Sequence, residues 1–254
     1  FEDISRAADG GLSAEMLQNG DFEYNKEDHR HQWNATTAWE GVEKEGIATE
    51  NGVSQNNPHY AVLGATPIYN IGWDGIAIRR GAAVEGKEGK HQPAIYEVSL
   101  HVGTRCFDAK KKNLTLALVN QEGLPVCQAK IKVQGTDWKE YKAQLIVTDK
   151  YEGELASEAI TKEGKLGKNI RFAILPKGEQ KVAVDLVSLN PQDTYKGHGL
   201  RKDLAEAIAD LKPRFVRFPG GCMLHGQGLK NIYHWKESVG PQKDRKPAYN
   251  IWGY

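Results

Sequence analysis

The sequence predicts a mainly β protein, a two-layer sandwich of jelly-roll type followed by a short α/β segment. From about residue 21 to residue 189, short apolar or alternating runs recur between Gly, Asn, Asp and Pro residues, as in β-sandwiches. From residue 190 onward, a helical pattern precedes a short apolar run and a glycine loop, as in an α/β unit. The length of 254 residues is enough to bury a large core.

About eight runs in the first part have the length and alternation of β-strands. In chain order they are residues 59–63, 75–79, 94–102, 113–119, 129–133, 141–147, 170–175 and 182–189. The polar stretch 150–168 contains glycine and is interpreted as an exposed loop. Strands of this number with turn signals between them predict two packed antiparallel sheets.

The last 65 residues follow a different pattern. Residues 199–211 predict a helix, because one helical face carries Leu200, Leu204, Ile208 and Leu211. Pro213 ends this helix, and residues 214–218 predict a short buried strand closed by a Pro-Gly-Gly loop. A β/α barrel needs about 250 residues of its own, so this segment cannot close one. Either it folds onto the sandwich, or the chain is part of a longer protein, which we favour.

Composition limits the classes of partner. Hydrophobic residues are 39% and charged residues 26%, and 34 basic against 33 acidic residues give a net charge of +1. We therefore expect neither nucleic acid nor membrane as a partner, and no window has the roughly 18 apolar residues of a membrane span. No signal peptide is present and the chain begins at Phe1, so the N-terminus is expected to be processed or cut. The three cysteines, Cys106, Cys127 and Cys222, do not make a disulfide framework.

Two motifs point to hydroxyl-rich ligands. Arg217–Cys222 (RFPGGC) follows a predicted parallel strand, where barrel enzymes place their working loops. Paired glycines let the backbone approach a ligand, and the arginine donates several hydrogen bonds. Glu2 follows an apolar residue at the end of another candidate strand, where its carboxylate can accept hydrogen bonds from sugar hydroxyls. A turn required by the fold and a surface acid remain the structural alternatives.

Six aromatic residues in the β-rich part can stack on sugar rings or fill the core. They are Trp33, Trp39, Tyr60, Tyr69, Trp73 and Trp138. Asp21, Glu23 and Asp185 would supply oxygen ligands to a structural Ca²⁺ if the first and last sandwich strands were adjacent. His29 and His31 lack further zinc ligands at usable spacing. No nucleotide-binding loop or hydrolase serine motif is present, so no cofactor and no metal is predicted.

Both ends of the chain resemble glycoside hydrolase family 51, the α-L-arabinofuranosidases. At the start the resemblance rests on Phe1–Ile4 (FEDI), 8–11 (ADGG) and Phe22–Glu23. Towards the end it rests on 199–213 (GLRKDLAEAIADLKP), Arg217–Cys222, 235–241 (WKESVGP) and 250–254 (NIWGY). The middle is similar only to a carbohydrate-binding-module-like jelly roll.

The resemblance implies a galactose-binding-like jelly roll inserted after the first strand of a (β/α)8 barrel, of which only the first elements are present. Residues 1–18 would be the first strand and its loop, 19–189 the sandwich, and 190–254 the start of the catalytic barrel. It implies that Glu2, Arg217, Cys222 and Trp252 bind the arabinose, with Cys222 standing where many members have asparagine. The family retains configuration through two glutamates about 5 Å apart. Both would lie beyond Tyr254, so no catalytic residue is assigned and this chain alone is expected to be inactive.

The implied activity is hydrolysis of terminal non-reducing α-L-arabinofuranosyl residues from arabinan or arabinoxylan. The expected partner is an arabinose-containing polysaccharide, and the expected location is secreted or periplasmic. The alternative is a stand-alone carbohydrate-binding module without catalysis, and a purely structural sandwich is a third possibility. The helix and strand at 199–218 would lose their barrel neighbours in the isolated chain. We therefore expect self-association through this region, as a homo-oligomer, or poor order there.

Overall fold

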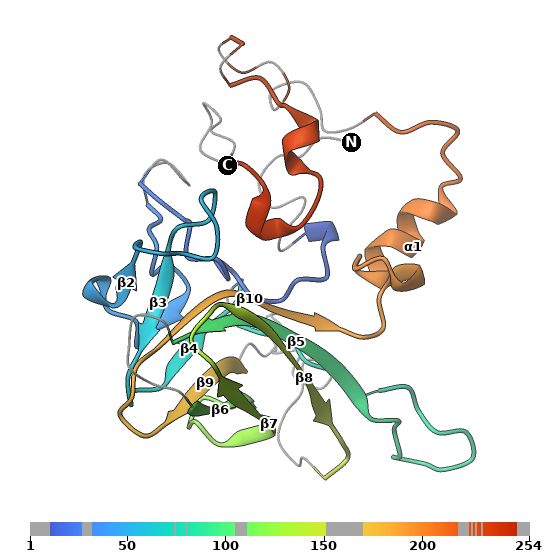
Figure 1. The fold of residues 1–254 in the computed structure, drawn as a ribbon. Coiled ribbons are helices and arrows are strands. Elements are labelled where there is room, and N and C mark those ends of the chain that lie inside the picture. Colours follow the sequence, from blue (N-terminus) through green and yellow to red (C-terminus); the bar gives the residue numbers. More distant parts are fainter. Residues whose placement is uncertain are drawn as a thin grey trace.

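The chain forms two antiparallel sheets that pack face to face (Figure 1). The computed structural model describes residues 11–26, 32–73, 75–79, 81–104, 111–150, 170–217, 224, 226, 228, 229 and 231–247. Within these residues, one sheet has the strand order β1-β4-β9-β6-β7 and the other has the order β2-β3-β10-β5-β8. The predicted mainly β sandwich is thus confirmed.

The first sheet consists of β1 (Trp39–Glu40), β4 (Ile68–Asn70), β9 (Arg171–Lys177), β6 (Lys111–Val119) and β7 (Pro125–Gln134). The second sheet consists of β2 (Ile47–Ala48), β3 (Tyr60–Leu63), β10 (Val182–Pro191), β5 (Ala94–Gly103) and β8 (Lys139–Val147). Neighbours within each sheet pair antiparallel throughout. Strands from both ends of the chain therefore meet within each sheet, which makes most of its pairings long-range.

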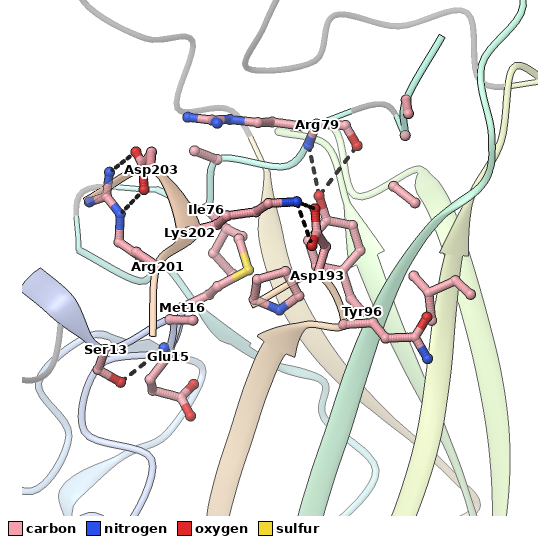
Figure 2. Close-up of a pocket in the computed structure, with 18 of the residues that line it drawn as sticks. Ser13, Glu15, Met16, Ile76, Arg79, Tyr96, Asp193, Arg201, Lys202 and Asp203 are labelled. Atoms are coloured by element: carbon pink, nitrogen blue, oxygen red, sulfur yellow. Dashed lines mark hydrogen bonds and ion pairs between the residues drawn. The ribbon is translucent and has the colours of Figure 1, made fainter. Parts of the chain in front are cut away.

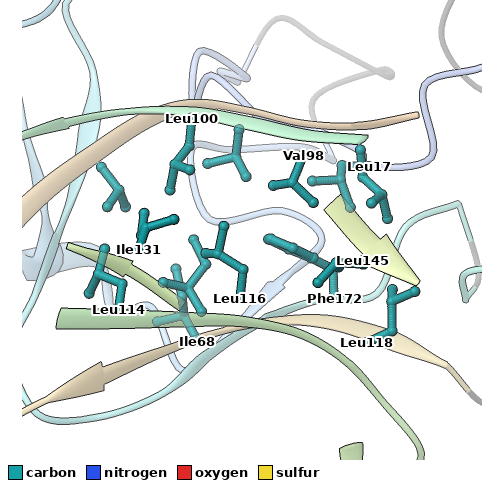
Figure 3. Packing of buried hydrophobic residues seen from close by; sticks show 14 of the residues in the cluster. Leu17, Ile68, Val98, Leu100, Leu114, Leu116, Leu118, Ile131, Leu145 and Phe172 are labelled. Atoms are coloured by element: carbon teal, nitrogen blue, oxygen red, sulfur yellow. The ribbon is translucent and has the colours of Figure 1, made fainter. Parts of the chain in front are cut away.

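The core lies between the sheets, where alternate residues of facing strands meet (Figure 3). On β5, Val98 and Leu100 point inward, while β6 supplies Leu114, Leu116 and Leu118, all fully buried. Alternation with period two places one face of each strand in this core. Burial of this apolar surface, at roughly 25 cal/mol per Å², is the main stabilising contribution to the sandwich.

Strand β10 carries a bulge, because its pairing with β5 shifts between Asp185 and Ser188. Leu186 takes a left-handed conformation, with φ of 48°, and is the residue that the bulge accommodates. The Val187 amide then donates to the Gly20 carbonyl oxygen at 2.7 Å. The segment containing Gly20 is thereby held against the bulge.

The prediction of a strand at 75–79 is wrong, because the described structure forms no strand there. Ile76 makes only an isolated bridge with Ile170, although Ile76 and Ile78 are both buried. Alternation of apolar residues indicates which side chains are buried, whereas a strand also needs a neighbouring strand that pairs with it along its length. The short strands β1, β2 and β4 were not predicted, since two or three residues give too short a pattern. The loop expected at 150–168 lies almost wholly outside the described residues.

The predicted helix is confirmed as α1 (Lys202–Asp210), beginning three residues later than expected. The strand predicted at 214–218 is not formed over residues 214–217, and Phe215 and Val216 are 85% and 68% exposed. A parallel strand requires neighbouring strands on its edges, and the described residues supply none here. Short 3₁₀ turns are η3 (Lys44–Gly46), η4 (Tyr195–Gly197), η5 (Trp235–Ser238) and η6 (Gln242–Asp244).

The segments on either side of the sandwich lie next to each other. Ser13 forms an antiparallel bridge with Leu200, the Ala14 amide donates to the Gly199 oxygen at 2.8 Å, and the Arg201 amide donates to the Leu12 oxygen at 2.8 Å. These bonds fix the start of α1 beside the entry to the sandwich. No helix within the described ranges is long and apolar enough to cross a membrane.

Candidate functional site

A cavity of about 710 Å³ lies between α1 and one end of the sandwich (Figure 2). Its walls come from residues 13–16, 73, 75–77, 79, 81, 82, 93–96 and 191–193 and from the start of α1. The apolar floor includes Met16, Ile76 and Tyr96. The Tyr96 hydroxyl accepts from the Arg79 amide at 2.8 Å and lies 3.3 Å from the Arg79 oxygen, and burial raises the pKa of this phenol.

Charged side chains surround the opening of the cavity. The Lys202 ammonium donates to both Asp193 carboxylate oxygens at 3.0 Å, and this hydrogen bond raises the pKa of Lys202. Arg201 holds the Asp203 carboxylate through Nε at 3.2 Å and a terminal nitrogen at 2.7 Å, which lowers the pKa of Asp203. Both pairs are largely solvent-exposed, so each contributes little stability. Their carboxylates are therefore accessible to a ligand.

Glu15 fixes the wall of the cavity that faces the sandwich. Its carboxylate accepts from the Leu17 and Leu189 amides at 3.0 and 2.9 Å, from the Ser188 hydroxyl at 2.5 Å and from the Asn190 side-chain amide at 3.1 Å. A carboxylate that accepts several hydrogen bonds is well satisfied when partly buried. Residues 13–17 are thus anchored to β10, and Met16 is positioned at the floor.

The aromatic residues divide between core and surface positions. Trp39 is buried, stacks on Phe22 at 5.0 Å and donates from Nε1 to the Asn19 oxygen, while Tyr60 is buried and donates to the Glu50 oxygen. Both therefore fill the core, which is the structural alternative stated above.

The remaining aromatics of that set are less buried. Trp33 stacks on Tyr24 at 4.6 Å and lies edge-on to Trp73 at 6.2 Å. Trp73 lines the cavity and is the one predicted aromatic that does so among the described residues. Tyr69 lies under the Arg171 guanidinium, and Trp138 donates to the Asn51 oxygen.

The three acids considered for Ca²⁺ do come close together beside the bulge of β10. The Asp185 carboxyl is fully buried, and desolvation, with the charges of Asp21 and Glu23, raises its pKa well above the ordinary value. Glu23, however, already accepts from Asn57 at 2.8 Å and contacts the His59 imidazole at 2.6 Å. In the part of the chain that the structure describes, no three His, Cys, Asp or Glu side chains form a metal-binding group. The geometry therefore does not support a calcium site made by these carboxylates.

Cys127 is the described cysteine, and it is a free, half-buried thiol. Burial raises its pKa to about 11, so it is a neutral thiol near pH 7 and a poor nucleophile. Cys106 lies outside the described residues, as do His29 and His31.

Of the predicted arabinose-binding residues, only Arg217 is described. It is exposed and follows α1 and residues 214–216, which form no strand. Glu2, Cys222 and Trp252 lie outside the described residues, so their expected meeting with Arg217 stays a prediction. The cavity residues gave no sequence signal, because they come from five separate segments and form no motif. Only their distribution in space identifies the cavity.

Comparison with known proteins agrees with the sequence resemblance. The alpha-L-arabinofuranosidase 1 domain family matches residues 207–254. An extracellular exo-alpha-L-arabinofuranosidase of Streptomyces chartreusis is 35% identical over 100% of this chain and 28% of its own length. Alpha-L-arabinofuranosidase 1 of Arabidopsis thaliana is 30% identical over 100% of this chain and 35% of its own length. The chain thus spans about a third of these relatives.

A solved structure of similar fold covers the whole chain. The arabinose-bound MgGH51 α-L-arabinofuranosidase superposes with a TM-score of 0.75, at 24% identity, over 100% of this chain and 39% of that one. At this identity the likeness supports the fold, while the matches to the two relatives support the family. Along its whole length the chain is therefore similar to a portion of α-L-arabinofuranosidases, among them a solved member of glycoside hydrolase family 51.

Proposed function

We propose that this chain is the N-terminal part of a retaining α-L-arabinofuranosidase that removes terminal non-reducing α-L-arabinofuranosyl residues from arabinan or arabinoxylan. The observation that carries the proposal is the match of 35% identity across the whole chain to a protein named as an extracellular exo-arabinofuranosidase. That name also supports a secreted or periplasmic location. The partner is then an arabinose-containing polysaccharide.

We further propose that the sandwich, residues 19–189, is inserted into a barrel that residues 1–18 and 190–254 begin. The contacts between Ser13 and Leu200 and between Leu12 and Arg201 support this arrangement. An insertion needs its two flanks to lie close together, because the host elements must continue across it. The two segments that flank the sandwich meet through backbone hydrogen bonds in this way.

Glu2, Arg217, Cys222 and Trp252 would form part of the arabinose subsite in the complete protein. The catalytic glutamates would be supplied by the barrel strands that follow Tyr254, so residues 1–254 alone would not hydrolyse arabinofuranosides. In this role Arg217 donates hydrogen bonds to the sugar.

Arg217→Ala in the full-length protein tests the assignment. Loss of hydrogen bonds from a charged donor should lower kcat/KM on an aryl α-L-arabinofuranoside by about 10- to 100-fold. Arg214→Ala is the matched control, since Arg214 is an exposed arginine of the same segment. Equal kinetics of the two variants would refute the role of Arg217, and absence of hydrolysis by the wild-type protein would refute the enzyme proposal.

In the isolated chain, the incomplete barrel region would associate with a second copy. Leu211, Phe215 and Val216 are 78%, 85% and 68% exposed, a concentration of apolar surface that a soluble monomer rarely presents. Light scattering on residues 1–254 should then give a mass above 28.2 kDa. A monomer with slow amide exchange across 199–218 would contradict this expectation.

A further inference from the structure

We propose that the cavity between α1 and the sandwich is a binding site for a short, uncharged arabinose-containing oligosaccharide. The choice of sugar rests on the proposed function, whereas the preference for an uncharged polyhydroxyl ligand comes from the cavity itself. Arg217, the described residue of the proposed arabinose subsite, does not line this cavity. The proposal therefore assigns sugar binding to the junction of the sandwich and α1.

The size and floor of the cavity fit such a ligand. About 710 Å³ is within the range of small-molecule sites, roughly 300–1,000 Å³. Met16, Ile76 and Tyr96 give it an apolar lining (Figure 2). Trp73 lines it as well. A sugar ring has an apolar C–H face that packs on such a lining, and an indole face is the most extensive surface available for it.

The charges around the opening favour a neutral ligand. The lining residues include the acids Glu15, Asp193, Asp203 and Glu206 and the bases Arg79, Arg201 and Lys202, so neither sign dominates. A phosphorylated ligand would meet carboxylates, and a cation would meet guanidinium groups and the Lys202 ammonium. Hydroxyl groups both donate and accept, so they can satisfy carboxylates and cations together.

The polar groups can change partners at little cost. In the Lys202–Asp193 pair the two side chains are 48% and 76% exposed, and in the Arg201–Asp203 pair they are 41% and 45% exposed. Exposed pairs of this kind contribute between nothing and about 1 kcal/mol. A ligand hydroxyl can therefore accept from Lys202 or donate to Asp193 without breaking a buried network. The backbone behind them is held by the Glu15 and Tyr96 hydrogen bonds, so the site is formed before a ligand enters.

Two exposed lining residues allow a test with little risk to folding. Glu206→Ala removes an acceptor from the α1 side, and Gln192→Ala removes an amide from the end of β10. Asp210→Ala is the matched control, because Asp210 is an exposed acid on α1 that does not line the cavity. Thermal unfolding midpoints equal to the wild-type value would show that the variants are folded.

The experiment is affinity electrophoresis of the full-length protein in gels that contain arabinan, arabinoxylan or dextran. The wild type should be retarded by the arabinose polymers and not by dextran. Each cavity variant should bind up to tenfold more weakly, the effect of one hydrogen bond lost from a polar ligand, and the double variant weaker still. Asp210→Ala should behave as the wild type.

Three results would overturn the proposal: no retardation of the wild type, equal retardation of the cavity variants and the wild type, or equal retardation by dextran. Hydrolysis of an aryl α-L-arabinofuranoside by the wild type is measured in parallel. Retardation without hydrolysis would refute the enzyme proposal alone, whereas hydrolysis without a loss of retardation in the variants would refute the cavity proposal alone.

Discussion

Gly20→Ala should destabilise the sandwich, because residue 20 passes directly against the bulge of β10. A Cβ at this position would overlap the Val187 carbonyl oxygen and lie 3.1 Å from its carbonyl carbon, and both are backbone atoms. Relief of the overlap would lengthen the 2.7 Å hydrogen bond from Val187 to Gly20, worth about 1 kcal/mol. It would also displace Phe22, which lies two residues after Gly20 and is fully buried, at a further cost of about 1–3 kcal/mol.

We therefore expect the free energy of unfolding to fall by about 2–4 kcal/mol in total. The measurement is the midpoint of urea unfolding, followed by tryptophan fluorescence with the slope unchanged. Gly64→Ala is the matched control, because a Cβ there has no atom within 4 Å and the residue has no left-handed φ. The free energy of unfolding of Gly64→Ala should be unchanged or higher than that of the wild type by up to about 1 kcal/mol. Equal midpoints for the two variants would refute the steric argument.

Three more variants test other parts of the sandwich. Glu15→Ala should lower the unfolding midpoint and increase hydrogen exchange at the amides of residues 13–17, because the Glu15 carboxylate accepts four hydrogen bonds that hold this segment against β10; unchanged exchange would contradict this. Lys112→Met should lower the free energy of unfolding by about 2–4 kcal/mol, since the buried ammonium donates to the carbonyls of Gly64, Gly178 and Gln180. Urea unfolding measures this loss, and an unchanged free energy of unfolding would contradict the prediction. The raised pKa of Asp185 means that the folded state holds this proton more tightly than the unfolded state, so stability falls as pH rises from about 4 towards the folded pKa. Asp185→Asn should therefore gain stability relative to the wild type as pH rises from 4 to 7, and parallel pH profiles would refute the assignment.

Much of the fold was predictable because strand patterns are local. The alternating runs at 94–102, 141–147 and 182–189 correspond to β5, β8 and β10, with ends that differ by a few residues. The runs at 75–79 and 214–218 were predicted by the same rule and do not form strands where described. In both cases the apolar pattern is present, but the described structure supplies no partner strand along the segment.

The proposed roles of Arg217 and Glu2 rest on a local motif and on the resemblance, and they stay predictions. The cavity was not predictable, since Glu15, Arg79, Asp193 and Lys202 are separated by up to 187 residues and share no spacing. The sequence could not assign Trp73 to the core or to the cavity, because core and ligand-facing tryptophans have the same local pattern.

The sequence by itself determined the class of fold, the position of the helix, the balanced charge and the resemblance to a family. These depend on composition, on periodicity and on residues adjacent in the chain. Only the tertiary structure decided that Leu12–Ala14 pair with Gly199–Arg201, that Asp185 is buried beside two other acids, and that a cavity opens between α1 and the sandwich. Each of these depends on the register and bulges of long-range strand pairing, which no local pattern specifies.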